Sequence, residues 1–500
     1  MKTYWGDIHN HCGISYGFGS LENALKTAKE QLDFVSITGH ASWYDMPDRK
    51  APLEYLVDFH TEGFAKLEKH WDEVRAVVKS YNVDHEFVTF QGYEAHSSAY
   101  GDHHYITPDD DFPIVKGETP LDIINQLRPR RVIAVPHHVG YTPGYRGGNW
   151  DNFNPDISPI VEVVSKHGCG LSVNSKLPYY HDMGPRDSRS TVYAAIARKL
   201  KVGFVGSTDH HAGYPGSYGD GKMAVVATEK TREGIWEAIL ARRTYAVTGD
   251  KIDCRFTLND APMGSTVAAT TKREIAVDVT ACDQIEKITI FKNLRPWRQV
   301  TAFDLQQKSA DAVANTTYKV RVEMGWGGDQ VGYKWDAQVQ INNGQLQSVE
   351  SCFRGRSVLA PTPELKADPN INALSNAVHE QTDQQVSWSC TTVKNPTTLH
   401  PLTAGVILEI AGNEQTKLEL QANGIVITTT IGELLQGNVT KHKYAYNSEA
   451  VVIHPAIPAY RYTYTGKFVD EQQEDECDVY HVEVEQNNGQ CAYLSPIYVE

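Results

Sequence analysis

Residues 202–211 read VGFVGSTDHH, a short apolar run followed at once by polar side chains. The run Val202–Gly206 is typical of a buried strand, because it is continuous and apolar. Asp209 and His211 follow it, and residues i and i+2 of an extended chain point to the same face. A carboxylate and an imidazole placed in this way can bind one metal ion. The same combination of strand and ligand recurs through the first half of the chain.

Four other strand ends carry histidine or glutamate, and fifteen of the twenty histidines lie at or before His211. The further candidates are His9 and His11 after Tyr4–Ile8, His40 after Leu32–Thr38, Glu94 after Phe87–Gln91, His137 and His138 after Val132–Pro136, and His103 and His104 beside Asp102 in a loop. Asp7 precedes the first pair and is placed to orient a ligand. Burying imidazoles without partners is costly, so folding alone does not explain five such ends. The sequence therefore predicts a metal site.

Helical patterns alternate with these strands and with a further apolar run, Ile160–Val164. Ser20 is placed to cap a helix with one apolar face made by Leu21, Ala24, Leu25, Ala28 and Leu32. Other helices are predicted around Tyr55–Tyr81, Pro120–Leu127, Ser190–Leu200 and Arg232–Arg243. This alternation predicts an α/β fold with a parallel sheet, doubly wound or closed into a barrel. We favour the (β/α) barrel, because its strand C-termini converge on one site.

After residue 250 the helical period nearly disappears and strands dominate. The predicted strands are Glu274–Thr280, Ile285–Phe291, Tyr318–Glu323, Ala337–Ile341, Gly405–Ile410, Gly424–Thr430, Tyr460–Thr465 and Val479–Glu485. Asn-Gly turns such as Asn423-Gly424 fit hairpins. The sequence thus predicts one domain over 1–250 and an all-β, sandwich-like region over 251–500, as one or two sub-domains. The polar, proline-containing stretch 351–402 is predicted to be an insertion or a long loop.

Charge and composition narrow the function classes. The net charge of −15 disfavours nucleic acid as a partner, because phosphate backbones select basic surfaces. No apolar run approaches the ~20 residues of a membrane span, and the N-terminal MKTYWGDIHNHCG lacks the apolar region of a signal peptide. The eight cysteines form no CxxC pair and are expected to be reduced, the one alternative being Cys477 with Cys491 across a hairpin. We expect a cytoplasmic protein.

The phrases GDIHNHCG, LDFVSITGHA, GYEAH, VIAVPHH and GSTDHHAGYPG appear in an order that resembles the PHP (polymerase and histidinol phosphatase) superfamily of metal-dependent hydrolases. The resemblance covers residues 4–250, and TREGIWEAILARRTYAVTGD followed by a β region resembles one branch of it. It implies a distorted (β/α)7 barrel, a TIM-like barrel with two or three metals at the strand C-termini. The chain departs from the family at Gly39, where aspartate is frequent, and at Ser15–Gly17, where a third-site histidine is expected.

The resemblance also implies a ligand set. One metal would be held by His9, His11, Asp209 and a bridging Glu94. A second would take one of His103 and His104 and one of His137 and His138, for which we choose His104 and His137. His40 and His211 would hold a third ion or serve as acid and base, with Glu94 also in a catalytic role. We expect two divalent ions, with a third left open, and nitrogen-rich ligation favours Zn, Mn or Fe.

The predicted function is a phosphoesterase acting on a small phosphorylated molecule, with Arg146 as the substrate-binding cation. The alternative is a metal-dependent hydrolase or lyase acting on a carbohydrate or another non-phosphate substrate, which the loop aromatics Trp43 and Trp150 would suit. A third reading is a non-catalytic module with structural metals. The motif Gly13–Gly17 fits G-x-S-x-G, but no helix follows Ser15 directly, so we expect a loop residue. His167 and His181 are not assigned, and a homo-oligomer stays open.

Overall fold

The apolar runs of the first half form short strands with helices between them, in a computed structural model that describes residues 1–181, 183–307, 316–327, 332–357, 374–393 and 403–500. Ser20 caps the first helix, since its hydroxyl accepts the Asn23 N–H at 3.2 Å. The elements are β1 (Lys2–Asp7), α1 (Leu21–Lys29), β2 (Phe34–Ser36), β3 (Gly39–Trp43), α2 (Glu54–Tyr81), β4 (Val88–His96), β5 (His103–Thr107), α3 (Pro120–Leu127), β6 (Ile133–Pro136), β7 (Ile160–Ser165), β8 (Gly168–Cys169), α4 (Val192–Ala197), β9 (Gly203–Gly206), β10 (Lys222–Ala227), α5 (Arg232–Leu240) and β11 (Thr244–Val247). The predicted strands and helices of this half are confirmed, with shifts of a few residues at their ends.

The predicted (β/α)7 barrel is wrong. Strands β1, β2 and β4 are parallel, but β5 runs antiparallel to both β4 and β6, and β10 runs antiparallel to β1. Within the described residues the sheet stays open: β6 is one edge, and β7, β8 and β9 form a separate three-stranded sheet. The cause lies in the connections, because the six residues between β4 and β5 are too few for the crossover that a parallel neighbour needs. A TIM-like barrel is therefore not formed.

The open sheet still brings the predicted ligands to one edge. The parallel strands β1 and β4 present their carboxyl ends there, and β3, which is parallel to β4, adds its own residues. Since β5 runs the other way, its beginning lies at the same edge, where His104 pairs with Glu94 in the strand register. The end of β6 follows, with Pro136 opposite His103. On the other side the isolated bridge from Asn10 to His210 ties the end of β1 to the residues after β9.

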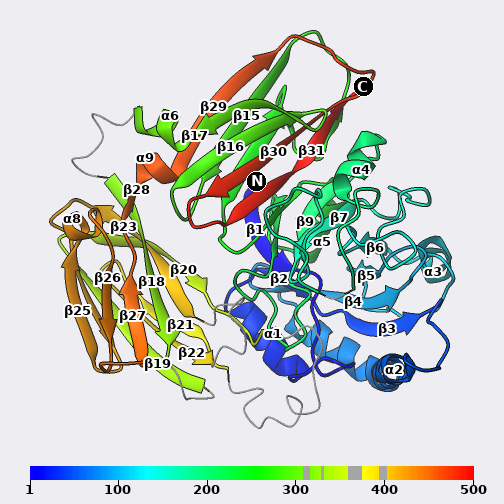
Figure 1. The fold of residues 1–500 in the computed structure, drawn as a ribbon, viewed down its shortest axis with the longest axis horizontal. Coiled ribbons are helices and arrows are strands. Elements are labelled where there is room, and N and C mark those ends of the chain that lie inside the picture. Colours follow the sequence, from blue (N-terminus) through cyan, green and yellow to red (C-terminus); the bar gives the residue numbers. More distant parts are fainter. Residues whose placement is uncertain (182, 308–315, 328–331, 358–373, 394–402) are drawn as a thin grey trace.

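The first and second halves share one long sheet. Its order is β17-β16-β30-β31-β11-β10-β1-β2-β4-β5-β6, so the last strand of the chain pairs with β11. In this sheet β11 and β10 lie between the C-terminal strand β31 and the N-terminal strand β1, so both ends of the chain belong to the same sheet (Figure 1). The elements of this region are β12 (Asp253–Leu258), β13 (Ala261–Pro262), β14 (Thr266–Val267), β15 (Arg273–Thr280), β16 (Ile285–Lys292), β17 (Arg295–Thr301), α6 (Ala302–Gln307), β28 (Ile457–Pro458), α9 (Ala459–Tyr462), β29 (Thr463–Asp470), β30 (Asp478–Gln486) and β31 (Cys491–Val499). The boundary at residue 250 stays a prediction.

Beyond residue 250 most regular elements of the described chain are strands. Strands β12, β13, β15 and β29 form a four-stranded sheet whose alternating buried residues pack on the long sheet around Phe256 and Val482. A second sandwich joins a six-stranded and a five-stranded sheet around Trp335 and Trp388. Its elements are β18 (Thr316–Trp326), β19 (Gly332–Asn342), β20 (Gln345–Cys352), β21 (Ala377–Gln381), β22 (Gln385–Val393), β23 (Ala404–Gly412), β24 (Lys417–Ala422), β25 (Ile425–Thr430), α8 (Ile431–Leu434), β26 (Val439–His442) and β27 (Glu449–Ile453).

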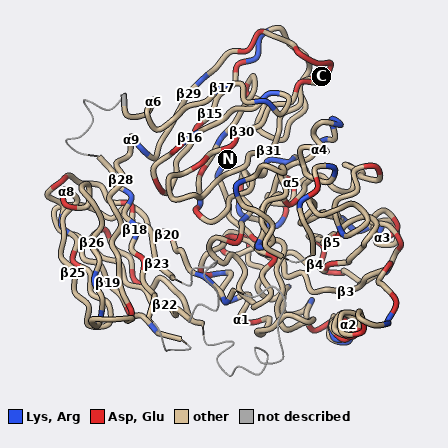
Figure 2. Tube along the Cα trace, in the orientation of Figure 1, with Lys and Arg blue, Asp and Glu red and all other residues tan. Residues whose placement is uncertain are grey.

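Part of the stretch 351–402 is regular structure. Residues 374–393 contain β21 and β22, and the buried Trp388 and Cys390 belong to the sandwich core, so the loop prediction is wrong there. Residues 358–373 and 394–402 lie outside the described chain. All eight cysteines are free thiols, as expected. Among the described helices, none combines the length and the apolar character that a membrane span needs. Basic and acidic residues are interspersed over the trace (Figure 2).

Candidate metal centre

Strands β1, β3, β4, β5, β6 and β9 deliver ligand-type side chains to one edge of the fold. The side chains that come together there are His9, His11, His40, Glu94, His96, His104, His137, Asp209 and His211, and none of these residues is more than 7% exposed. Buried imidazoles and carboxylates need partners, because leaving them unpaired costs free energy. Several trios of these residues have ligand atoms within 4.8 Å of one another.

Four side chains form the tightest group. His9 Nε2 and His11 Nε2 are 3.2 Å apart, and each lies 3.0–3.4 Å from Asp209 Oδ1 and from Glu94 Oε2. Four ligands bound to one ion at ~2.0–2.2 Å lie about 3.3–3.5 Å from one another. Two ring nitrogens facing each other at this distance make at most one hydrogen bond between them, whereas an ion would engage both lone pairs. These four residues therefore fit a divalent metal ion.

Glu94 lies between two groups. Its Oε2 faces His9 and His11, and its Oε1 lies 3.1 Å from His137 Nε2. His104 Nδ1 is 3.4 Å from His137 Nδ1, while its buried Nε2 has no hydrogen-bond partner among the described residues. The structure thus brings His104 and His137 together with His9.

The other member of each histidine pair has different contacts, although His138 also forms a possible metal-holding trio with Asp102 and His137 and lines the cavity beside the cluster. His103 points to the opposite side of β5, because neighbouring strand residues alternate between faces, and its Nδ1 donates to the Gly101 carbonyl at 2.9 Å. His138 Nε2 lies 3.3 Å from Asp102 Oδ2. His104 and His137 are therefore the better placed candidates, and their role as ligands stays a prediction.

A third group surrounds His40. Its Nε2 lies 3.1 Å from His211 Nε2, and its Nδ1 lies 3.0 Å from Glu94 Oε2 and 3.2 Å from His96 Nε2. The Tyr16 hydroxyl contacts His40 Nδ1 at 2.9 Å, in the segment where the resemblance led us to expect a histidine. His40, Glu94 and His96 together can hold an ion, as can His11, His40 and His211.

Two carboxylates support the cluster without belonging to the predicted ligand set. Asp7 does not touch a ligand ring; it accepts the backbone N–H groups of His9, Thr208 and Gly216 at 2.9–3.2 Å. It therefore holds the end of β1 against the loop that carries Asp209. The ring of His9 is oriented instead by Glu162, whose Oε2 lies 2.8 Å from His9 Nδ1.

Sequence reasoning gave no role in the site to four residues. Glu162, His96, Asp102 and His167 all contact predicted ligands or their neighbours. Glu162 had a signal, since it is the one charged residue in the apolar run IVEVVS. His96 stands two positions after Glu94 and so shares its face. His167, whose Nε2 lies 3.0 Å from Asp209 Oδ2, stands two residues after the end of β7.

Burial and mutual charge set the protonation of the cluster. Burial lowers the pKa of His104 and of His137 well below the ordinary value. For Glu94 burial acts to raise the pKa, but the neighbouring imidazoles of His40, His96 and His137 outweigh it and hold the pKa well below its usual range. Neutral imidazoles and ionised carboxylates are the forms that bind metals. For His9 burial acts to lower the pKa, but the carboxylates of Asp209 and Glu162 raise it well above its ordinary value.

The cluster opens onto a cavity of about 420 Å³. Its wall includes five residues of the cluster and Arg146, and its other lining residues are Tyr16, Trp43, Tyr55, Leu56, Phe59, His60, His138, His167, His181 and Met183. Arg146 donates from Nε to Asp102 Oδ2 at 2.7 Å, and its guanidinium lies 5.0 Å from the Trp43 ring centre. Because the Asp102 carboxylate pairs with the guanidinium, the positive charge of Arg146 is partly neutralised. Among the described residues, no lysine lines this cavity.

Comparison with known proteins adds little beyond the site itself. No family model matches the chain. An uncharacterized protein of Chlamydia trachomatis is 28% identical over 200 residues, which is 36% of this chain and 31% of that protein. One of Chlamydia pneumoniae is 25% identical over 247 residues, 45% of this chain and 39% of that protein, so the chain spans about a third of the length of the curated relatives it matches.

A solved structure from Bacteroides vulgatus shows a weak likeness. It is described as a two-domain protein containing a "predicted PHP-like metal-dependent phosphoesterase" and is 15% identical. The match covers 60% of this chain and 85% of that chain, with a TM-score of 0.31.

Proposed function

We propose that the chain is a metal-dependent hydrolase that cleaves a phosphate ester. The observation that carries this proposal is the group of His9, His11, Glu94 and Asp209, whose ligand atoms have the spacing of a single coordination sphere. Glu94 faces the His104–His137 group with its second oxygen, which supports a two-metal centre. The His40 and His211 group supports a third position. The two-metal set contains four imidazoles, and six if His40 and His211 are included, and such nitrogen-rich ligation favours Zn, Mn or Fe over Mg or Ca.

The residues around the cluster suit hydrolysis. When bound, divalent ions supply Lewis acidity to a water molecule and to the oxygens of the substrate. His40 and His211 line the cavity and face each other at 3.1 Å, so one can hold a proton and deliver it to a leaving group. Arg146 lies on the same wall and is placed to attract an anionic substrate. A purely structural metal site is normally closed, whereas this cluster opens onto a cavity.

A second candidate function is a metal-dependent hydrolase or lyase that acts on a carbohydrate or another non-phosphate substrate. The specific observation in its favour is the composition of the cavity wall. Arg146 already pairs with Asp102, and the rings of Trp43, Tyr55 and Phe59 line the cavity. Aromatic rings suit an uncharged, ring-containing substrate better than a phosphate dianion.

The test combines metal analysis with turnover. We expect about two to three equivalents of metal in the purified protein, and release of phosphate from members of a panel of phosphomonoesters and phosphodiesters. The double variant His9→Ala/His11→Ala should lose both properties. The matched control is His70→Ala, an exposed histidine on α2. Metal without turnover of any phosphate ester would favour the second candidate. No metal, even after reconstitution, would refute the metal-dependent function altogether.

A further inference from the structure

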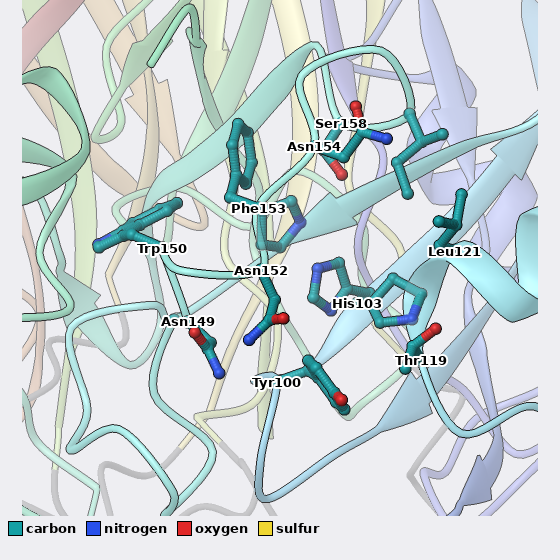
Figure 3. Close-up of a pocket in the computed structure, with 14 residues that line it drawn as sticks. Tyr100, His103, Thr119, Leu121, Asn149, Trp150, Asn152, Phe153, Asn154 and Ser158 are labelled. Carbon is teal, nitrogen blue, oxygen red and sulfur yellow. The ribbon is translucent and has the colours of Figure 1, made fainter. Parts of the chain in front are cut away.

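A second pocket lies on the other side of the strands that carry the metal cluster. His103 and Pro136 face each other in the register of β5 and β6 and line it, whereas their neighbours His104 and His137 lie in the cluster. The pocket has a volume of about 210 Å³. We call it the β5–β6 pocket. Figure 3 shows His103 in the middle of its labelled residues, with Asn152 and Tyr100 close by.

Its lining carries no charge. None of the described side chains around it is an aspartate, glutamate, lysine or arginine. The nearby first turn of α3 would attract an anion only weakly, because the Asp122 carboxylate already accepts the Thr119 N–H there. A charged ligand would therefore be desolvated without compensation.

The lining combines aromatic faces with unused hydrogen-bonding groups. Tyr100, Trp150 and Phe153 contribute rings, and Trp150 is fixed by a hydrogen bond from Nε1 to the Thr191 carbonyl at 3.0 Å. Among the described residues, no hydrogen bond is made by His103 Nε2 or by the Ser158 hydroxyl, although these residues are only 6% and 2% exposed. Such groups are normally satisfied by a ligand or water.

The contact made by His103 Nδ1 determines whether its Nε2 donates or accepts a hydrogen bond. Because Nδ1 contacts a carbonyl oxygen, it must carry the proton, so Nε2 is an acceptor. A ligand hydroxyl can donate to it, and the Ser158 hydroxyl and the Asn152 amide can both donate and accept. The volume lies below the ~300 Å³ of sites that hold drug-sized molecules, so it suits about one ring. We propose that the β5–β6 pocket binds one neutral pyranose unit of a saccharide.

The experiment is calorimetric titration of the full chain with neutral monosaccharides and their methyl glycosides, compared with glucuronate, glucosamine and glucose 6-phosphate. We expect at least one neutral sugar to bind, and its charged analogues to bind about tenfold more weakly or not at all. Phe153→Ala and Asn152→Ala should each weaken binding about tenfold, the usual effect of losing a ring contact or a hydrogen bond. The control is Tyr446→Ala, a 91% exposed aromatic residue elsewhere, which should leave binding unchanged.

The same titration on His9→Ala/His11→Ala separates this pocket from the metal centre. The double variant should still bind the neutral sugar, even if it no longer hydrolyses phosphate esters. Three results would overturn the proposal: no neutral sugar binds at the highest soluble concentration, the pocket variants bind as the wild type does, or the double histidine variant abolishes binding.

Discussion

At the scale of single residues, Glu162 is the side chain that fixes the orientation of His9. Its carboxylate lies 2.8 Å from His9 Nδ1, which turns Nε2 toward His11, Asp209 and Glu94. Burial raises the pKa of Glu162 to about 7, so the interaction with His9 is what keeps this carboxylate partly ionised. Groups that orient a metal-binding histidine also increase its basicity.

We predict that Glu162→Gln weakens metal binding about 10–100-fold, the usual effect of losing such an orienting carboxylate. The fold should survive, because glutamine has the same shape. Metal affinity is measured by competition with a chelating dye. Glu286→Gln, an exposed glutamate on β16, is the control. Unchanged affinity in Glu162→Gln would mean that Glu162 has no role in preparing the ligand.

Glu323 in the second sandwich makes stability depend on pH. Burial acts to raise its pKa, but contacts with His454, 2.8 Å away, and with the Thr403 hydroxyl outweigh burial and lower the pKa to about 2 from 4.5. Because the folded pKa is the lower one, the stabilisation is complete above pH 4.5 and is lost as the pH falls toward 2. It amounts to about 3 kcal/mol.

Glu323→Gln should therefore be less stable than the wild type near pH 6, with a gap that narrows as the pH drops below about 4.5. The free energy of unfolding in urea at several pH values measures this. The exposed Glu380→Gln should show no such dependence. A gap that stays constant with pH would contradict the assignment.

At the scale of elements, the sequence predicts where strands end but not how they pair. The run before Glu94 and the run before His137 were both recognised, and their polar ends do meet. Apolar runs look alike in parallel and antiparallel sheets, so the hydrophobic pattern does not show that β5 runs antiparallel to β4 and β6. The six-residue link before it was the available clue. His96 and Glu162 carry only single-residue signals, a face shared with Glu94 and one charge in an apolar run, and neither belongs to a motif that names a ligand.

Asp7 joins two of these elements, and its removal should loosen both. The carboxylate accepts N–H groups from the end of β1 and from the loop after β9, at 2.9–3.2 Å. In Asp7→Asn the amide cannot accept all of them, and hydrogen bonds to a charged group contribute about 1.5–3 kcal/mol each. We expect a loss of about 3 kcal/mol in unfolding free energy and weaker metal binding. The exposed Asp48→Asn is the control. Full stability in Asp7→Asn would show that this carboxylate is dispensable.

At the scale of the whole molecule, one sheet runs through both halves, and one buried carboxylate ties them further. Asp250, at the turn after β11, accepts Arg321 Nη2 at 2.8 and 2.9 Å from β18. It also accepts the Tyr218 hydroxyl at 2.7 Å and the side-chain amides of Gln486 and Asn488 at 2.6 and 2.7 Å. The loop after the metal cluster, the second sandwich and the C-terminal hairpin therefore meet at a single charge.

We predict that this junction makes the two halves unfold together. The wild type should show one cooperative transition in denaturant, because strands β11 and β31 cannot separate without breaking the shared sheet. Asp250→Ala leaves the Arg321 guanidinium, which is 13% exposed, without its carboxylate, and breaking a buried ion pair in this way costs about 3–5 kcal/mol. Unfolding followed separately by tryptophan fluorescence and circular dichroism measures both effects, with the exposed Asp278→Ala on β15 as the control. Two separate transitions in the wild type would mean that the two halves unfold independently. A loss of unfolding free energy below about 1 kcal/mol in Asp250→Ala would mean that the junction is only a contact between them.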